Sequence, residues 1–243
     1  MVQRKHRRQQ KTWVILAVIA ALFLASGIYF GTYYHADETA HAAMQSDDAV
    51  TIAEIPQGGY LFDGPGEGTA MIFYPGAKVE TIAYAPLLHQ IAAEGCDVFL
   101  LEMPFHMAFF AVNKADQIRQ DYEETSWYMA GHSLGAAMAA QYSASHLEEY
   151  DGLILLAGYP TADLHAENFR LLSIYGSEDG HQKMLQKNPQ YDPDDTTIVV
   201  LEGGNHAQFG NYGIQSGDGI ASISRQEQQK QTSEAIREFL KND

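Results

Sequence analysis

Residues 131–135 (GHSLG) place a serine between two glycines, a spacing that can present a nucleophile. The motif follows an apolar run, residues 126–130, and precedes an alanine-rich stretch. A sharp turn from a strand into a helix lifts the serine hydroxyl clear of the sheet, and Gly131 and Gly135 lack bulk because strand and helix nearly touch there. The N-terminus of the helix also directs backbone N–H groups toward charge developing beside Ser133. This context favours a nucleophilic serine over an ordinary glycine-rich turn.

A serine nucleophile needs a base, and the base needs a carboxylate that orients it. In a chain with a G-x-S-x-G turn, the acid and then the histidine are expected after the serine in the sequence, each just beyond a later strand. Asp179 and His206 follow two successive apolar runs in that order. Asp179 is preferred to its neighbour Glu178 because it stands at a bend before Gly180. We therefore expect Ser133, Asp179 and His206 to form a catalytic triad.

Acyl transfer through a tetrahedral intermediate also needs two N–H donors for its oxyanion. The backbone N–H of Leu134, the residue after the nucleophile, is expected to be one of them. The other is expected in the loop after the apolar run 70–74, where Ala77 is the first choice and Lys78 the alternative. Gly76 gives this loop its backbone freedom. No paired-histidine spacing typical of a metal site occurs, so we expect no metal.

The rest of the chain alternates between predicted strands and helices. Strands are predicted over residues 51–55, 60–62, 70–74, 97–103, 126–130, 152–157, 170–175 and 196–201, and helices over 81–94, from the GHSLG motif to about 146, and over 222–240. Continuous apolar runs are typical of parallel strands covered on both faces. The alternation predicts an α/β domain over residues 50–243, with a mostly parallel central sheet and helices on both faces.

Four segments of this domain resemble the α/β-hydrolase superfamily: FYPGAKV, GHSLGAAMA, YGSEDG and GGNHAQFGNYG. The chain is similar to small, lidless bacterial serine carboxylesterases and to the dienelactone-hydrolase-like branch. This resemblance implies the α/β-hydrolase fold and hydrolysis of carboxylic esters or related acyl bonds without a cofactor. Dienelactone hydrolase itself has a cysteine where this chain has Ser133. Residues 76–78 also lack the histidine-glycine pair that many esterases carry before the oxyanion donor.

The surroundings of the site are expected to be open. Only residues 159–169 separate two predicted strands where many relatives insert a lid, and so short a segment cannot form one. Loops must therefore supply any cover. The apolar residues 105–112 are interpreted either as a wall of an acyl pocket or as a helix packed on the sheet. The glycine-rich residues 209–222 are interpreted as a flap at the mouth of the pocket.

Charge excludes one class of partner. The 243 residues carry 15 Lys+Arg against 31 Asp+Glu, a net charge of −16, so nucleic-acid binding is not expected. The single cysteine, Cys96, excludes an intramolecular disulfide and a multi-cysteine metal site. Cys96 lies in an apolar run, where a buried small hydrophobic side chain is the favoured interpretation.

The first residues of the chain are interpreted as a membrane anchor or targeting signal. Five basic residues in the segment 1–12 precede residues 13–30, an uncharged run that as a helix nearly matches a hydrocarbon core of about 30 Å. We expect a transmembrane anchor over 13–34, a linker over 35–49 and a domain on the extracytoplasmic side of the cell membrane. A cleaved signal with its site at residues 40–42 is the alternative, but the apolar run exceeds the usual ~7–15 residues.

Three functions follow from these observations. The first is a membrane-anchored serine hydrolase whose partners are the cytoplasmic membrane and a small-molecule ester. The second is an acyltransferase that uses the same triad to acylate an envelope sugar or lipid. The third is a tethered binding protein without catalysis, against which the complete set of triad residues argues.

Overall fold

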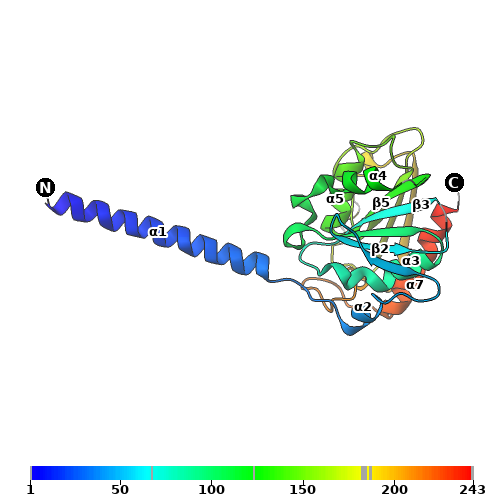
Figure 1. Cartoon of the computed structure of the whole chain (residues 1–243), viewed down its shortest axis with the longest axis horizontal. Coiled ribbons are helices and arrows are strands. Elements are labelled where there is room, and N and C mark those ends of the chain that lie inside the picture. The colour runs from blue at the N-terminus through cyan, green and yellow to red at the C-terminus, as the bar shows by residue number, and fades with distance from the viewer. Residues whose placement is uncertain (1, 67, 123, 182–184, 186–187, 242–243) are drawn as a thin grey trace. The chain divides into compact units, whose positions relative to one another are not determined.

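An eight-stranded sheet organises the part of the chain that the structure, a computed structural model, describes (Figure 1). It describes residues 2–66, 68–122, 124–181, 185 and 188–241, with the side chains of residues 2–10, 12 and 14 left out. The chain forms two units, residues 1–33 and 34–243. The strands of the second unit are β1 (Thr51–Glu54), β2 (Gly59–Asp63), β3 (Thr69–Tyr74), β4 (Asp97–Leu101), β5 (Ser126–His132), β6 (Gly152–Leu156), β7 (Arg170–Gly176) and β8 (Asp195–Leu201).

The sheet is mostly parallel, as predicted. Its order is β1-β2-β4-β3-β5-β6-β7-β8, with antiparallel pairs only between β1 and β2 and between β2 and β4. The register pairs Tyr74 with Gly131, His132 with Leu156, and Gly176 with Leu201. The carboxyl ends of the parallel strands therefore meet at one edge of the sheet, where the loops that follow them converge.

Helices cover both faces of the sheet (Figure 1). Within the described residues of this unit, the helices are α2 (Glu38–Ala42), α3 (Ala85–Ala93), α4 (Ala115–Asp121), α5 (Leu134–Ser143) and α7 (Arg225–Leu240). The apolar residues of α3 and α7 pack in one core cluster, and those of α4 and α5 pack in the other. Successive residues of β3 alternate between the two, with Met71 and Phe73 on one face and Ala70 and Ile72 on the other. Both faces are thus buried, which explains the continuous apolar runs.

Two predicted helices differ in detail. The helix expected over 81–94 is a 3-10 turn, η1 (Thr81–Tyr84), followed by α3, in which a proline occupies the first turn. Residues 105–112 do not form a helix on the sheet. Short 3-10 turns replace it: η2 (Pro104–His106), η3 (Ala108–Phe110) and η4 (Val112–Lys114). Two further 3-10 turns, η5 (Pro189–Tyr191) and η6 (Ala207–Phe209), lie later in the chain.

The linker predicted over residues 35–49 belongs instead to the folded unit. Asp37 caps α2 by accepting a hydrogen bond from the N–H of Ala40 at 3.0 Å, and it forms an ion pair with Arg225 at 3.0 Å. The side chain of Ala40 is fully buried. Small polar residues predicted a linker because composition alone does not reveal a cap and an ion pair with a residue 188 positions away.

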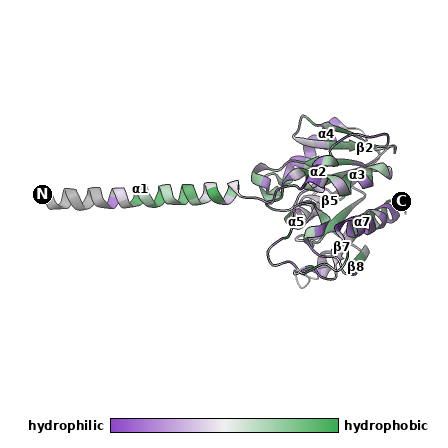
Figure 2. Ribbon diagram, turned by 90° about the horizontal axis from the view of Figure 1, so that it is seen from below, coloured by the Kyte–Doolittle hydropathy of each residue, from purple (hydrophilic) through white to green (hydrophobic). Residues whose placement is uncertain are grey.

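The first unit contains the helix α1 (Val2–Gly31). Large apolar side chains such as Trp13 and Phe23 are exposed along it, and Figure 2 shows apolar residues over much of its length. Among the residues that the structure describes, no helix is long and apolar enough to cross a membrane. The transmembrane part of the prediction for residues 13–34 therefore has no support from the structure.

Candidate active site

Ser133 stands alone between the end of β5 and the beginning of α5, the predicted strand–turn–helix context. Its backbone has φ 55° and ψ −119°, a left-handed conformation that residues with a side chain rarely adopt. The N–H of Ser133 donates to the carbonyl of Leu156 at 2.9 Å, which fixes the turn against β6. The half-buried serine is thus held in a strained turn at the edge where the strands end.

The two glycines of the motif permit the close approach of strand and helix. A Cβ atom on Gly135 would lie 2.1 Å from the carbonyl oxygen of Tyr74, and one on Gly131 would lie 2.6 Å from the carbonyl carbon of Gly135. Both contacts are with backbone, which cannot move aside as a side chain can. The predicted reason for glycine at these positions is therefore met in the structure.

Asp179 and His206 form a buried hydrogen-bonded pair. Nδ1 of His206 lies 2.8 Å from Oδ2 of Asp179, and neither side chain is more than 4% exposed. Because a carboxylate only accepts, Nδ1 carries the proton and donates it, which leaves the lone pair of a neutral ring on Nε2. Nε2 is buried and has no hydrogen-bond partner among the described residues. The alternative acid, Glu178, is exposed.

Ser133 and His206 line the same cavity, which has a volume of about 250 Å³. Its lining includes Ser133, Leu134, Ala137, Ala157, Gly158, Tyr159, His181, Leu185, His206 and Gln215. The flanking loop over 209–222 contributes Gln215, whereas none of residues 105–112 is part of this lining. The interpretation of 105–112 as the wall of this cavity is therefore not met, and most of the lining is apolar.

The two predicted oxyanion donors differ in their placement. Leu134 lines the cavity and is the first residue of α5, so its N–H has no partner within the helix. Ala77 is not in the described lining, although its loop begins beside α5, where Pro75 approaches Gly135. The N–H of the alternative, Lys78, already donates to the carbonyl of His106 at 2.7 Å. Within this loop the geometry therefore favours Ala77 over Lys78.

His132 belongs to a buried network that the sequence did not predict. Its Nδ1 lies 2.8 Å from the hydroxyl of Tyr84, and its Nε2 lies 3.1 Å from the carbonyl of His206. Burial, with His206 close by, holds the pKa of His132 well below its usual value. The neutral ring must then donate from Nε2, because a carbonyl only accepts. Nδ1 consequently accepts the Tyr84 hydroxyl proton, and the Tyr84 oxygen accepts the N–H of Gly76 at 3.0 Å.

This network joins three strand ends. Gly76 follows β3, His132 ends β5, and His206 follows β8. Each group in the network donates a hydrogen bond to the next group or accepts one from it. Rotation of the Tyr84 or His132 side chain would therefore leave a buried polar group without a partner. The network therefore fixes the loop of the predicted donor Ala77 relative to the backbone of His206.

Replacing Tyr84 with phenylalanine is expected to lower the free energy of unfolding by about 1–3 kcal/mol, since the Gly76 N–H and His132 Nδ1 lose a buried partner. Urea denaturation of the wild type and Tyr84→Phe measures this loss. Tyr175→Phe is the matched control, since Tyr175 is a buried tyrosine of β7 that takes no part in this network. Equal losses in the two variants would contradict a specific role of the network.

His132 is also expected to make stability depend on pH. Its pKa in the folded state is lowered, so below an unfolded pKa of about 6.5 the unfolded chain binds a proton that the folded chain does not. Stability should therefore fall as pH drops from 7 to 5, with a contribution of up to about 1.4 kcal/mol per pH unit from this residue. Urea denaturation at several pH values should give a shallower slope for His132→Gln. Equal slopes would contradict the prediction.

Asp218 is a second residue that the sequence did not single out. Its Oδ1 accepts the N–H of His206 at 3.1 Å, and its Oδ2 accepts the N–H of Ala207 at 2.8 Å. Oδ1 also lies 3.3 Å from the N–H of Gly180, next to Asp179. Asp218 thus ties the loop expected to be a flap to both the acid and the base. Its position in a glycine-rich loop provided no signal of this role.

His181 adds a further imidazole beside the pair. Its Nδ1 lies 3.5 Å from Oδ1 of Asp179, and ligand atoms of Asp179, His181 and His206 all lie within 4.8 Å of one another. These residue types and distances could hold a metal ion, although no spacing motif predicted one. Asp179 and His206 of this group also form the hydrogen bond described above.

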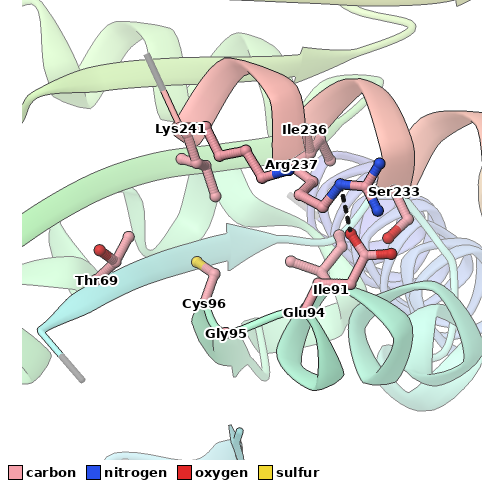
Figure 3. A pocket seen from close by; sticks show the side chains of 10 residues that line it. Thr69, Ile91, Glu94, Gly95, Cys96, Ser233, Ile236, Arg237 and Lys241 are labelled. Atoms are coloured by element: carbon pink, nitrogen blue, oxygen red, sulfur yellow. Dashed lines mark ion pairs between the residues drawn. The ribbon is translucent and has the colours of Figure 1, made fainter. Parts of the chain in front are cut away.

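A second cavity, of about 170 Å³, lies at the amino ends of β3 and β4 (Figure 3). It is lined by residues of α3 and α7 and by Cys96 just before β4. Arg237, whose guanidinium points toward Glu94 in the figure, forms an ion pair with it at 3.9 Å. Cys96 is buried, as expected, and its burial raises the pKa of the thiol. None of the predicted catalytic residues lies here.

Comparison with known proteins agrees with this fold. The model of the alpha/beta hydrolase family matches residues 70–230. Three of the similar solved structures are carboxyl esterase 2 from the fungus Tuber melanosporum, Est1E from Butyrivibrio proteoclasticus and a laboratory-evolved variant of potato epoxide hydrolase.

These structures share the fold at low sequence identity. The fungal esterase has a TM-score of 0.56 at 12% identity over 84% of this chain and 89% of its own. Est1E has 0.51 at 15% over 80% and 98%, and the epoxide hydrolase variant has 0.58 at 11% over 81% and 100%. No curated protein matched. Because the family model spans well over half of the chain and the sheet carries a serine at a strained strand-to-helix turn, the chain belongs to the α/β hydrolase family.

Proposed function

We propose that the chain is a serine hydrolase that cleaves carboxylic esters through an acyl-enzyme, with Ser133 as nucleophile, His206 as base and Asp179 as the orienting carboxylate. The bond between Nδ1 of His206 and Asp179 carries this proposal, since it leaves Nε2 without a partner at the cavity that Ser133 also lines. An unpartnered buried nitrogen at the cavity that a strained serine also lines suits proton transfer. The esterases among the similar structures support the same reaction class.

The reaction follows from these groups. Oγ of Ser133 attacks the ester carbonyl carbon while Nε2 of His206 takes its proton. The N–H groups of Leu134 and Ala77 hold the oxyanion of the tetrahedral intermediate. The intermediate collapses as His206 donates the proton to the leaving alcohol. Water, deprotonated by His206, then attacks the acyl-serine, and His206 returns the proton to Oγ of Ser133 as the carboxylic acid leaves.

The cavity suits a small acyl group, because its volume is below the ~300–1,000 Å³ of sites that bury a drug-sized ligand. A series of nitrophenyl esters tests the proposal, and the highest kcat/KM is expected for short acyl chains. Product analysis with added acceptor alcohols separates hydrolysis from acyl transfer to an envelope sugar or lipid. Absence of turnover on every ester, together with no labelling of Ser133, would favour a binding protein.

We also propose that the N-terminal segment holds the domain at the extracytoplasmic face of the cell membrane. The uncharged residues 13–30 and the exposed side chains of Trp13 and Phe23 support attachment to lipid, and the preceding basic residues support a cytoplasmic N-terminus. Membrane fractionation of the full chain tests attachment, and protease treatment of intact cells tests the side. Recovery in the soluble fraction without the segment would indicate a cleaved signal.

A further inference from the structure

The folded unit begins at the loop that carries the predicted oxyanion donor. The N–H of Tyr34 donates to the carbonyl of Lys78 at 2.7 Å, and the N–H of Glu80 donates to the carbonyl of Tyr34 at 2.9 Å. These bonds form a parallel bridge between Tyr34 and Val79. The first residue of the unit is therefore fixed one residue beyond the Ala77–Lys78 turn.

Tyr34 also contacts the loop that follows His206. Its ring packs on Tyr212 with 5.6 Å between centroids, and its hydroxyl accepts the N–H of Ser216 at 3.4 Å. Gln215, the neighbour of Ser216, lines the cavity. The chain thus enters the unit between two loops that flank the candidate active site.

Only Thr32 and Tyr33 separate Tyr34 from Gly31, the last residue of α1. Three residues of extended chain span at most about 10 Å. The helix α1 therefore ends only three residues before Tyr34, a residue that contacts both flanking loops. A linker over 35–49 would have allowed the domain to turn freely, but those residues are folded.

Exposed aromatic side chains lie at the same edge of the sheet. Phe105, Phe109 and Phe110, here called the aromatic rim, are 58%, 45% and 44% exposed and follow β4. Their rings contact one another, with centroids 4.0 Å apart for Phe109 and Phe110 and 5.4 Å apart for Phe105 and Phe110. The carbonyl of His106 within this segment accepts the N–H of Lys78. A cluster of exposed aromatic side chains is typical of an interaction surface.

We infer that the aromatic rim rests on a lipid bilayer and that the substrate is an amphiphilic ester that reaches Ser133 from that bilayer. This inference rests on the proposed serine hydrolase and on membrane attachment. The short connection after α1 brings the site to the lipid surface, where Phe side chains insert at the level of the headgroups. The net charge of −16 disfavours binding of the domain to anionic lipid. The N-terminal segment, rather than charge attraction, therefore keeps the domain at a high local concentration near the bilayer.

The experiment uses the full chain reconstituted in phosphatidylcholine vesicles. Two esters are compared: nitrophenyl acetate in solution, and a fluorogenic ester in the same vesicles that carries a short acyl chain on a bilayer-embedded lipid anchor. The variant Phe105→Ser/Phe109→Ser/Phe110→Ser is expected to lose about tenfold in rate on the embedded ester, since apolar contact with lipid is removed. Its rate on nitrophenyl acetate should stay within about twofold, because the rim does not line the cavity.

The matched control is Ile198→Thr/Val200→Thr, which changes two exposed apolar side chains on β8 at the far side of the sheet order. This control should retain both activities. A second variant, with about 20 Gly/Ser residues inserted after Thr32, should lower the rate on the embedded ester while leaving the soluble ester unaffected, because the flexible insert frees the orientation of the domain.

The outcomes distinguish failure of the proposed function from failure of this inference alone. Absence of nitrophenyl acetate hydrolysis by the unmodified chain would contradict the proposed function itself. Hydrolysis of the soluble ester with equal rates of wild type and rim variant on the embedded ester would overturn this inference alone. Failure of the full chain to remain with the vesicles would overturn it as well.

Discussion

Replacing Ser133 with alanine is expected to lower kcat for a short acyl ester by about 10⁴-fold or more, because no acyl-enzyme can form without Oγ. Folding should be preserved. Alanine has no greater steric need at φ 55° than serine, and the described contacts of Ser133 are made by its backbone. The free energy of unfolding should therefore change by less than about 0.5 kcal/mol. Steady-state kinetics and urea denaturation of the purified protein measure the two quantities.

Ser143→Ala is the matched control for this variant. Ser143 is a buried serine at the end of α5 whose Oγ has no described partner, so its removal should leave activity unchanged. A variant Ser133→Ala that keeps more than a tenth of wild-type activity would show that another group attacks the ester.

Replacing Asp179 with asparagine is expected to lower kcat by about 10³–10⁴-fold. The amide can still accept the N–H of His181, which Oδ1 now accepts at 2.7 Å, so the loop is expected to remain folded. Its NH₂ group, turned toward His206, would however meet Nδ1 as a donor and favour the tautomer with the proton on Nε2. A ring protonated on Nε2 cannot take the proton of Ser133. Steady-state kinetics over a range of pH measures the loss.

Glu178→Gln provides the comparison, since it makes the same chemical change at the exposed neighbour. It should retain activity within about twofold. Loss of activity in Glu178→Gln with retention in Asp179→Asn would reverse the assignment of the acid. Equal retention in both variants would contradict an orienting carboxylate.

The sequence predicted the sheet and the positions of the site residues because these depend on local patterns. Buried parallel strands appear as uninterrupted apolar runs, and each is followed by turn residues, so both the strands and the loops at their ends could be inferred. Ser133, Asp179 and His206 could be placed because such a site draws its residues from successive strand ends. The bond between Asp179 and His206 is consistent with that placement.

Other features depend on contacts between distant residues and have no local pattern. Tyr84 and His132 are 48 positions apart, and Asp37 and Arg225 are 188 apart. Nothing in the composition of residues 35–49 reveals that they fold onto the domain. Asp218 likewise lies in a glycine-rich loop whose sequence indicates flexibility rather than hydrogen bonds to His206 and Ala207.

Residues 105–112 illustrate a third limit. Their apolar composition allowed a packed helix or a pocket wall, and the structure shows neither. Phe105 and His106 both have a φ of 54°, which interrupts any helix. Phe105, Phe109 and Phe110 are exposed whereas Ala108 is buried, a division that composition alone does not reveal.

The most direct test of the account is the labelling of the purified protein with a fluorophosphonate, followed by mass spectrometry to locate the modified residue. Such reagents react with a serine only when a base and an oxyanion site activate it. We expect one modification, on Ser133, and its loss in His206→Ala. Modification of a different residue, or labelling of Ser133 that persists without His206, would contradict an assembled Ser133–His206–Asp179 site.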